Sequence, residues 1–330
     1  MWTDQDQAVA TPAISTLDAD PAFLADVLAG LAASPKAIPA RWFYDRRGSE
    51  LFEAITALPE YYPTRTEAAL LERAGDDLAG LCDPGCAVIE FGSGSSAKTP
   101  TLLRHIEPAA YVPIDISGDF LRESARGIAS AFPGMAVFPV EANFMAPVPL
   151  PSAVQGRPKL GFFPGSTIGN LTPLAATDLL RTMRQSLGDG ARLLIGIDRI
   201  KDESVLVPAY DDAAGVTADF NLNLLTRINR ELDGTLPVDR FRHRAIWNDS
   251  LARIEMHLEA LDDLAFHVAG RRFTMKAGET IHTENSHKYG ARDARTLLLA
   301  GGWTPMAEWQ DDRGWFGLIL AEARPHPMAP

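Results

Sequence analysis

The chain has 330 residues, of which 46% are hydrophobic, so it can bury a large core and form one large domain or two interlocked domains. Its formal net charge is −12 and it contains no basic run, which argues against a nucleic-acid partner and against binding to an anionic membrane. We therefore expect small-molecule chemistry.

Helices and strands are predicted to alternate through the first two thirds of the chain. The helical stretches are 17–33, 67–81, 100–106, 118–131 and 173–187, and the strand-like runs are 87–91, 110–115, 135–140, 159–163 and 191–197. Repetition of strand, helix and strand predicts an open α/β fold with a parallel sheet.

The alternation changes at residues 202–283, where a helical stretch at 213–232 precedes alternating polar and apolar runs such as 245–258. A helix at 291–300, a turn at 301–305 and a strand at 315–321 then return to the sheet. We expect a discontinuous organisation: a sheet domain at 66–200 and 290–330, a second α+β lobe at 13–65 and 201–289, and a flexible N-terminus at 1–12.

Targeting and metal signals are missing from the sequence. The opening residues, Met-Trp-Thr-Asp-Gln-Asp-Gln, do not form a basic region followed by an apolar core, and no segment has about 18 uninterrupted apolar residues. The only cysteines, Cys82 and Cys86, lack further ligands nearby, and the histidines, among them His282 and His287, show no His-Glu-x-x-His spacing. We expect a cytoplasmic protein without a metal.

The loop at 88–99, Val-Ile-Glu-Phe-Gly-Ser-Gly-Ser-Ser-Ala-Lys-Thr, joins a buried strand to a helix. Gly92 and Gly94 allow a tight turn and close approach of the backbone to a ligand. Asp115 ends the next apolar run, where a carboxylate can bind ribose hydroxyls. This arrangement predicts a cofactor that contains a ribose.

Two cofactors fit this loop. A dinucleotide prefers Gly-x-Gly-x-x-Gly, but Ala97 stands at the third glycine position, which weakens NAD without excluding it. A carboxylate at Glu90 would repel a pyrophosphate but suit a cationic sulfonium cofactor. The Glu-x-Gly-x-Gly form resembles the first motif of class I S-adenosylmethionine-dependent methyltransferases.

A second glycine-rich loop, Phe-Phe-Pro-Gly-Ser-Thr-Ile-Gly-Asn-Leu at 162–171, follows the strand at 159–163. Ligands of open α/β sheets bind at the carboxyl ends of the strands, so this loop should converge with the loop at Gly92. The alternative is a simple turn in which Asn170 caps the helix that starts near Pro173. Further acids are Asp198, which is expected to be a strand-end cap, and Asp211-Asp212, which are expected to mark a helix start before Ala213.

Several segments spread over nearly the whole chain carry a further pattern. They are Phe43-Tyr44-Asp45, Gly48-Ser49-Glu50-Leu51-Phe52, Leu58-Pro59-Glu60-Tyr61-Tyr62-Pro63-Thr64-Arg65, the loops at 90–99 and 163–171, and Ile281-His282-Thr283-Glu284-Asn285-Ser286. Together they resemble the histidine Nα-methyltransferases of ergothioneine biosynthesis. The resemblance implies a Rossmann-like class I methyltransferase sheet with a substrate lobe. It also implies three successive methyl transfers from S-adenosylmethionine to the α-amine of L-histidine, giving hercynine.

The same resemblance assigns the cofactor site. Gly92 and Lys98 would hold the methionine part of S-adenosylmethionine, with Lys98 supplying a cation for its carboxylate, and Asp115 would bind the ribose. Asn143 and Phe144 match an acid and aromatic pair that binds adenine. Because asparagine replaces the usual aspartate, its bond to the adenine amino group would be weaker.

For the amino acid, the resemblance assigns the carboxylate to Tyr61, Asn170 and Tyr210. Neutral donors are expected there, because a lysine or arginine near the reacting centre would repel the cationic cofactor. Asn170 and Gly165 would orient the amine, and Tyr44 would lie near the methyl donor.

The imidazole is assigned to Glu284 and Ser286, with Met256 on the pocket wall. A site that satisfies an imidazole rejects side chains that leave its polar groups unpaired. Tyrosines, Met256 and Glu284 also have ordinary alternatives as core or surface residues. Other readings of the whole chain are a methyltransferase for another amino acid or amine, an NAD-dependent oxidoreductase, or a binding module without turnover. We expect a monomer.

Overall fold

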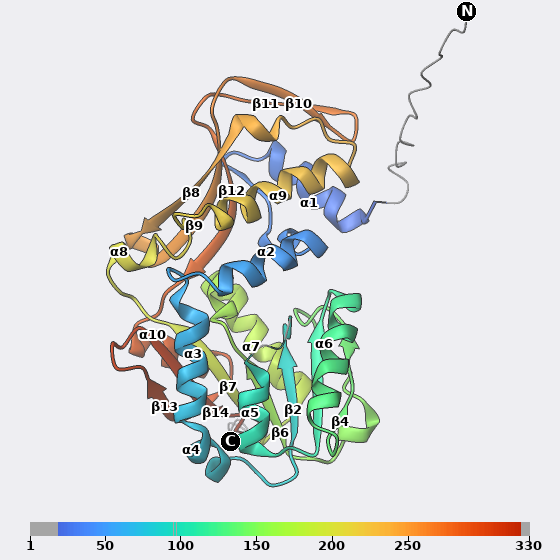
Figure 1. Ribbon diagram of the computed structural model, residues 1–330, viewed down its shortest axis with the longest axis vertical. Coiled ribbons are helices and arrows are strands. Elements are labelled where there is room, and N and C mark those ends of the chain that lie inside the picture. Colours follow the sequence, from blue (N-terminus) through green and yellow to red (C-terminus); the bar gives the residue numbers. More distant parts are fainter. Residues whose placement is uncertain (1–18, 95, 97, 325–330) are drawn as a thin grey trace, which may run out of the picture.

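A mixed eight-stranded sheet forms one half of the molecule in the computed structural model, which describes residues 19–94, 96 and 98–324 (Figure 1). The predicted flexible segment 1–12 and the third glycine position, Ala97, lie outside the described residues. The strands are β2 (Ala87–Phe91), β3 (Ala110–Asp115), β4 (Ala136–Val137), β5 (Val140–Glu141), β6 (Lys159–Phe163), β7 (Arg192–Asp198), β13 (Thr304–Gln310) and β14 (Phe316–Glu322).

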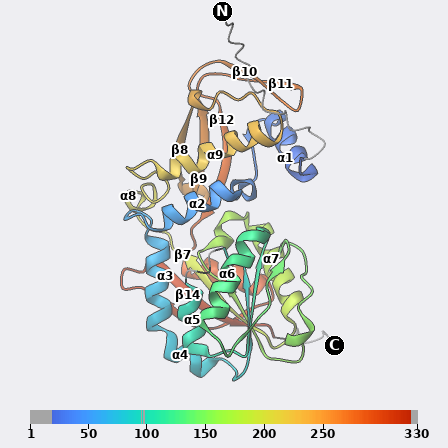
Figure 2. The ribbon, with the colours of Figure 1, turned by 45° about the vertical axis from the view of Figure 1, so that its right-hand side comes forward.

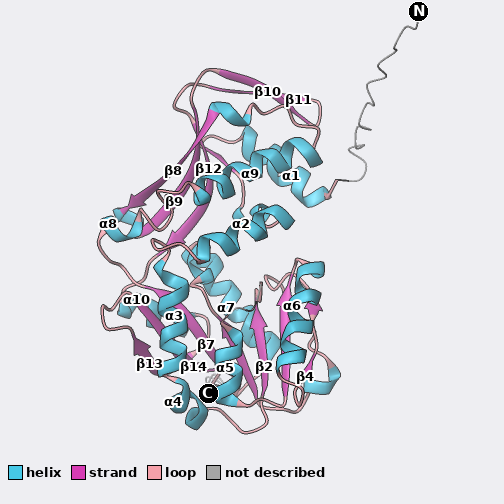
Figure 3. Cartoon of the chain, viewed as in Figure 1, coloured by secondary structure: helices cyan, strands magenta, loops and turns pink. Residues whose placement is uncertain are grey.

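The sheet order is β13-β14-β7-β6-β2-β3-β4, and β5 also pairs with β3. The pairs from β7 through β6 and β2 to β3 are parallel, as predicted, whereas β14 and β13 add an antiparallel edge. In Figure 3 the arrow of β2 points toward α2 and the second lobe, so the carboxyl ends of the parallel strands face that lobe.

Helices cover both faces of the sheet because side chains of the buried strands alternate between two apolar clusters. One face packs on α3 (Tyr62–Arg73), α4 (Gly75–Leu81), α5 (Thr99–Ile106) and α6 (Gly118–Ala131). The other face packs on α7 (Pro173–Leu187) and α10 (Ala291–Ala300). Successive residues Val88 and Ile89 belong to opposite clusters, as the period of a strand requires.

The second lobe lies beside the carboxyl ends of the strands in both views (Figures 1 and 2). Its four-stranded sheet has the order β1-β12-β9-β8, and β10 and β11 form a separate hairpin. The bounds are β1 (Lys36–Ala37), β8 (Phe241–Asn248), β9 (Arg253–Ala260), β10 (Leu264–Val268), β11 (Arg271–Met275) and β12 (Thr280–His287).

Helices pack on one side of this smaller sheet. They are α1 (Pro21–Ala32), η2 (Ala40–Phe43), α2 (Arg46–Thr56), α8 (Glu203–Leu206) and α9 (Val216–Glu231); short 3-10 turns are η3 (Ser152–Val154), η4 (Thr167–Asn170), η5 (Val238–Arg240) and η6 (Asp249–Leu251). One apolar cluster joins residues 23–62 with residues 206–281, so segments far apart in the sequence share a core. Within the described residues, no helix combines the length and apolar character needed to cross a membrane.

A bulge in β12 decides which side chains share a face. His282 lies opposite His257, but Glu284 lies opposite Met256, so Thr283 is the extra residue. Met256 and Ile254, the latter opposite Ser286, belong to the core of the lobe. Opposite residues in an antiparallel pair point to the same face, so Glu284 and Ser286 point inward while His282 and His257 point outward.

Several element predictions are confirmed to the residue, namely the strands 87–91, 110–115 and 159–163 and the helices 118–131, 173–187 and 291–300. The predicted helix 67–81 is instead two helices, because α3 begins at Tyr62 and ends at Arg73. The predicted strand 135–140 is reduced to the short β4 and β5.

Three capping predictions have different outcomes. Asp212 accepts the N–H groups of Val216 and Thr217, as a helix start requires. The cap of α7 is Thr172 rather than Asn170. The prediction for Asp198 was wrong, because its buried carboxylate binds side chains instead of capping a strand.

Gly48 of α2 provides a test of how the helix start is packed. A Cβ built on Gly48 would lie 1.8 Å from the carbonyl oxygen of Phe43, whereas a Cβ on Gly80 of α4 would contact nothing within 4 Å. Gly48→Ala should therefore lower the free energy of unfolding by about 2 to 4 kcal/mol. The control Gly80→Ala should raise it by up to about 1 kcal/mol, because alanine favours helix. Urea unfolding of both variants measures this, and a Gly48→Ala protein as stable as the parent would contradict the packing.

Candidate functional site

Both glycine-rich loops meet at one carboxylate, Glu67 of α3, which is fully buried. Lys98, from the first loop, forms an ion pair with Glu67. The backbone N–H of Gly165, from the second loop, donates to the two Glu67 oxygens at 3.1 and 2.8 Å. The predicted convergence of the loops is confirmed, and Glu67, which the motif analysis did not single out, is the residue that joins them.

At the end of β3, Asp115 is held by the backbone of the first loop. Its carboxylate accepts N–H groups from Gly94 at 3.0 Å and from Ser117 at 2.9 Å. Gly92 has a φ of +71°, and a Cβ there would lie 3.3 Å from the Phe144 ring. The backbone and that ring thus form a close-fitting cradle beside a fixed carboxylate, which suits a nucleoside.

Two predicted cofactor residues already have partners in the protein. The charge of Lys98 is balanced by Glu67, so a ligand carboxylate would have to share this cation. The exposed Asn143 accepts the N–H of Met145 at 3.0 Å through its side-chain oxygen. A carbonyl oxygen has two lone pairs, so one remains for a ligand donor.

Glu90 does not behave as its position in the motif indicates. It is 2% exposed, and its Oε2 accepts hydrogen bonds from Thr99 at 2.7 Å and from Tyr111. Burial raises the pKa of Glu90 to about 7. Glu90 therefore links the start of α5 to β3 through hydrogen bonds and so stabilises the glycine-rich loop from the protein interior.

Aromatic side chains form a wall between the two parts of the site. Ring centroids are 5.7 Å apart for Tyr44 and Phe52, 6.3 Å for Phe52 and Tyr61, and 6.2 Å for Tyr61 and Tyr210. Burial raises the pKa of Tyr44 well above its usual range, and the nearby carboxylates of Glu284 and Asp115 raise it further. Tyr44 therefore lies within electrostatic reach of both the predicted ribose acid and the predicted imidazole acid.

The predicted imidazole residues share the inner face of β9 and β12. Met256 is 2% exposed and lies opposite Glu284, and Ser286 is two residues farther along the same face. Burial raises the pKa of Glu284 to about 7, although Lys288 opposes the shift. The ionised form of a carboxyl group with this pKa is stabilised by a ligand that supplies an N–H donor or a positive charge.

A buried lysine lies where only neutral donors were expected. The Lys288 side chain is 0% exposed, and its Nζ contacts Tyr210 Oη and Ser286 Oγ at 2.8 Å each. Asp198 Oδ2 lies 2.7 Å from the same Nζ and forms an ion pair with it. The neutral donors expected for the carboxylate, Tyr61, Asn170 and Tyr210, stay a prediction, and Lys288 contacts one of them, Tyr210. The signal for Lys288 in the sequence is the alternation of Glu284, Ser286 and Lys288 along one strand face.

The Asp198 carboxylate also binds two other side chains. Tyr62 Oη donates to it at 2.7 Å, and Lys201 binds it at 2.5 Å. Against the opposing effect of burial, Lys288 and Lys201 hold the pKa of Asp198 below its ordinary value. The network is thus a charged cluster of mutually bonded side chains that contacts Tyr210 and Ser286 through Lys288.

The predicted amine-orienting residues lie at the end of β6. Asn170 ends the turn η4, whose Gly169 carbonyl lies 2.9 Å from His287 Nδ1. This contact fixes η4 against β12 and brings half-buried Asn170 toward the strand that carries Glu284. Gly165 has a φ of +78°, and its N–H already donates to Glu67.

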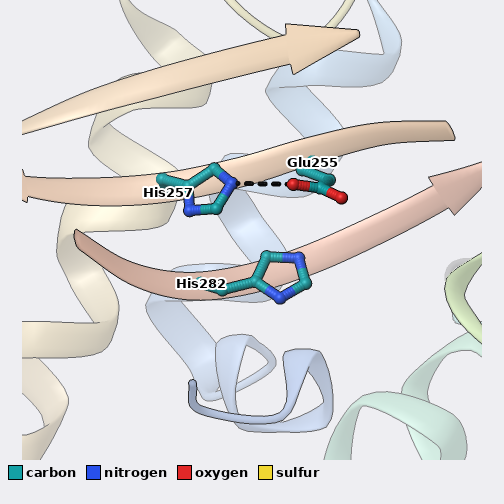
Figure 4. A group of neighbouring side chains, drawn as sticks. All are labelled: Glu255, His257 and His282. Carbon is teal, nitrogen blue, oxygen red and sulfur yellow. Dashed lines mark hydrogen bonds and ion pairs between the residues drawn. The ribbon is translucent and has the colours of Figure 1, made fainter. Parts of the chain in front are cut away.

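A cluster of possible metal ligands occupies the outer face of the same strands (Figure 4). One nitrogen each of His257 and His282 and one oxygen of Glu255 lie within 4.8 Å of one another. Arg253 binds Glu255 at 2.6 Å and Asn248 donates to it at 2.9 Å, while His257 lies 3.2 Å away. Burial lowers the pKa of both imidazoles. Because the carboxylate is already satisfied by protein donors, we assign no metal to this cluster, and the predicted lack of a metal stays a prediction.

Comparisons with known proteins agree over almost the whole chain. A family model described as "Histidine-specific methyltransferase, SAM-dependent" matches residues 23–323. Histidine N-alpha-methyltransferase of Mycolicibacterium smegmatis is 41% identical over 302 residues, covering 90% of this chain and 93% of that protein. The protein of the same name from Mycobacterium tuberculosis is 40% identical with the same coverage. Ergothioneine biosynthesis protein 1 of Neurospora crassa is 27% identical over 88% of this chain and 34% of its own length.

The raised pKa of Glu90 predicts how the free energy of unfolding depends on pH. An ordinary carboxyl pKa of 4.5 in the unfolded chain and about 7 in the folded chain means that the unfolded state loses its proton first. The contribution of Glu90 to folding therefore falls as the pH rises from about 4.5 to about 7 and is constant above that. Relative to Glu90→Gln, the parent protein should lose up to roughly 3 kcal/mol of unfolding free energy over this range. Denaturant unfolding at several pH values measures the difference. Exposed Glu123→Gln is the control, and a pH-independent difference for Glu90→Gln would contradict the buried, raised-pKa carboxyl.

Proposed function

Because the chain belongs to the histidine-specific, S-adenosylmethionine-dependent methyltransferases, we propose that it methylates the α-amine of L-histidine three times. The product is hercynine, and the reaction is the first step of ergothioneine biosynthesis. The observation that carries the proposal is the inner face of β9 and β12, where Glu284, Ser286 and Met256 stand together. An acid, a hydroxyl and an apolar wall suit a flat ring with two nitrogens.

In this proposal the two halves of the fold bind different ligands. Residues 66–200 and 290–330 bind S-adenosylmethionine, and residues 13–65 and 201–289 bind the amino acid. The separate apolar clusters support this division, since one cluster joins residues 23–62 with 206–281 and two others lie on the faces of the large sheet. The protein acts as a cytoplasmic monomer in this proposal, and its two cysteines are unpaired.

The cradle formed by Gly92 and Phe144 fits a nucleoside, with Asp115 binding the ribose hydroxyls and Asn143 the adenine. Lys98 interacts with the carboxylate of the methionine part. When bound, S-adenosylmethionine supplies a methyl group that is already electrophilic, so the residues of the protein need only align the acceptor and exclude water.

Tyr61, Tyr210 and Asn170 bind the carboxylate of histidine in this proposal, while Asn170 and Gly165 orient the amine. Tyr44 lies at the junction with the cofactor, which its electrostatic proximity to both Asp115 and Glu284 supports. The aromatic wall gives the increasingly methylated cation faces to contact. Methylation ends at three groups because a quaternary amine has no lone pair.

Mass spectrometry tests the reaction directly. Purified protein with S-adenosylmethionine and a panel of amino acids should give products that carry one, two and three added methyl groups from histidine alone. Trimethylation of another amino acid or amine would preserve the cofactor assignment and overturn the pocket assignment. Cofactor binding without any methylation would favour a binding module.

Glu284 should matter for the acceptor and not for the cofactor. Glu284→Ala removes the buried partner of the imidazole, so kcat/KM for histidine should fall by about 1 to 3 kcal/mol in transition-state free energy. Affinity for S-adenosylmethionine, measured by calorimetry, should be nearly unchanged. The control is Glu279→Ala: Glu279 immediately precedes β12 and is paired with Lys36, so its removal should leave both quantities unchanged. Unaltered histidine kinetics in Glu284→Ala would remove this residue from the imidazole site.

A further inference from the structure

The hydrogen bonds of Lys288 are fully used inside the protein. An ammonium group has three N–H donors and no acceptor. Three oxygens surround this one: Asp198 Oδ2 at 2.7 Å, Tyr210 Oη at 2.8 Å and Ser286 Oγ at 2.8 Å. Both hydroxyl oxygens therefore accept a hydrogen bond from the lysine.

The two hydroxyls also bond to each other, because Tyr210 Oη and Ser286 Oγ are 2.7 Å apart. One of them donates its only proton in that contact. The pair consequently has a single hydroxyl proton left for a ligand, on Tyr210 or on Ser286 but not on both. Burial raises the pKa of Tyr210 well above its usual range, so its phenol keeps its proton.

The ligand decides between these two arrangements. A substrate carboxylate at Tyr210 needs a donor, since a phenol oxygen without a free proton would repel it. Tyr210 then donates to the carboxylate, and Ser286 donates to Tyr210. The remaining lone pair of Ser286 can only accept a hydrogen bond, so the imidazole nitrogen that faces it must carry a proton.

The other nitrogen of the ring meets Glu284, whose carboxylate, ionised above its pKa of about 7, also accepts. An imidazole between two acceptors needs two N–H groups, which only the imidazolium form has. We infer that Lys288 is a positioning residue that makes Ser286 an acceptor, so that the pocket binds the substrate ring as an imidazolium between Glu284 and Ser286. This inference rests on the proposed function and deepens it by naming the charge state of the bound substrate.

The surroundings of Glu284 allow this state. Tyrosines 44, 61 and 210 lie within its electrostatic reach, and burial raises the pKa of each, so they stay neutral. The charged groups that face the same region from the packed elements are Lys288, Asp198, Lys201, Asp115 and Glu67. Asp198 pairs with both Lys288 and Lys201, so this cluster carries one excess positive charge, but within the described residues no cation forms an ion pair with Glu284 itself, and an imidazolium would supply that contact.

The test uses hercynine as ligand, because its quaternary amine cannot titrate and its imidazole is the group in question. Calorimetry at pH 8.5 in two buffers with different ionisation enthalpies should show uptake of about one proton per ligand, since a free imidazole is neutral there. Between pH 8 and 9 the Kd should rise about tenfold. Binding without proton uptake, with a Kd independent of pH, would overturn the inference and leave the proposed function standing.

Nitrogen NMR of hercynine labelled in the ring locates the proton. Two protonated ring nitrogens are expected in the complex at pH 8.5, and a neutral tautomer would overturn the imidazolium assignment. If neither histidine nor hercynine binds while S-adenosylmethionine does, the proposed function itself fails, and this inference fails with it.

Variants test whether the proton uptake on hercynine binding depends on Lys288. In Lys288→Met the hydroxyls regain freedom, so proton uptake should fall by at least half, and Lys288→Arg should restore part of it. Uptake that is unchanged in a folded Lys288→Met protein would remove Lys288 from this role. Should Lys288→Met not fold, Ser286→Ala replaces it: hercynine affinity should fall at least fivefold, while exposed Ser130→Ala on α6 should not change it. Unaltered affinity in Ser286→Ala would overturn the inference.

Discussion

The buried carboxylate of Asp198 holds together the segments that carry the proposed substrate-binding residues. Tyr62 from α3, Lys201 after β7 and Lys288 after β12 all bind it, and its backbone N–H donates to Ser166 Oγ in the second glycine loop at 2.9 Å. Removing one member of a buried ion pair leaves an uncompensated charge and typically costs about 3 to 5 kcal/mol. Segments from both halves of the fold are thus held at one point, next to the residues proposed to bind the substrate.

Local patterns were sufficient for the elements that are buried and regular. The bounds of β2, β3, β6, α6, α7 and α10 follow from apolar runs, glycines and prolines that act within a few residues. β13 was not predicted, because its side chains are only partly buried, a proline lies near its start, and the register shifts between Pro305 and Ala307. An edge strand of this kind is defined by its partner β14 rather than by its own sequence.

The site shows the same division between local and long-range information. Motifs predict which residues face a ligand, since glycines and an acid at strand ends are typical of cofactor loops, and the two glycine-rich loops do converge. They did not indicate that Lys98 and Gly165 share Glu67, or that Lys288 and Asp198 lie behind Tyr210. These contacts join residues that are 31 to 98 positions apart, so no short sequence window contains them. The role predicted for Glu90 fails for the opposite reason. Its position in the motif correctly indicates a cofactor loop, but its side chain points into the core and binds Thr99.

The bulge at Thr283 links the chemistry of the pocket to the spacing of a single residue. Side chains of a strand alternate between faces, so if the same residues paired without the bulge, with Thr283 opposite Met256, the two faces would exchange from that point onward. Asn285 and His287 would then point inward, while Glu284, Ser286 and Lys288 would point to the outer face, and Asp198 would lose its principal cation. The one extra residue thus sets the face of acid, hydroxyl and lysine together. Deletion of Thr283 would restore a regular ladder with Glu284 still opposite Met256, whereas deletion of Asn285 would turn Ser286 and Lys288 outward.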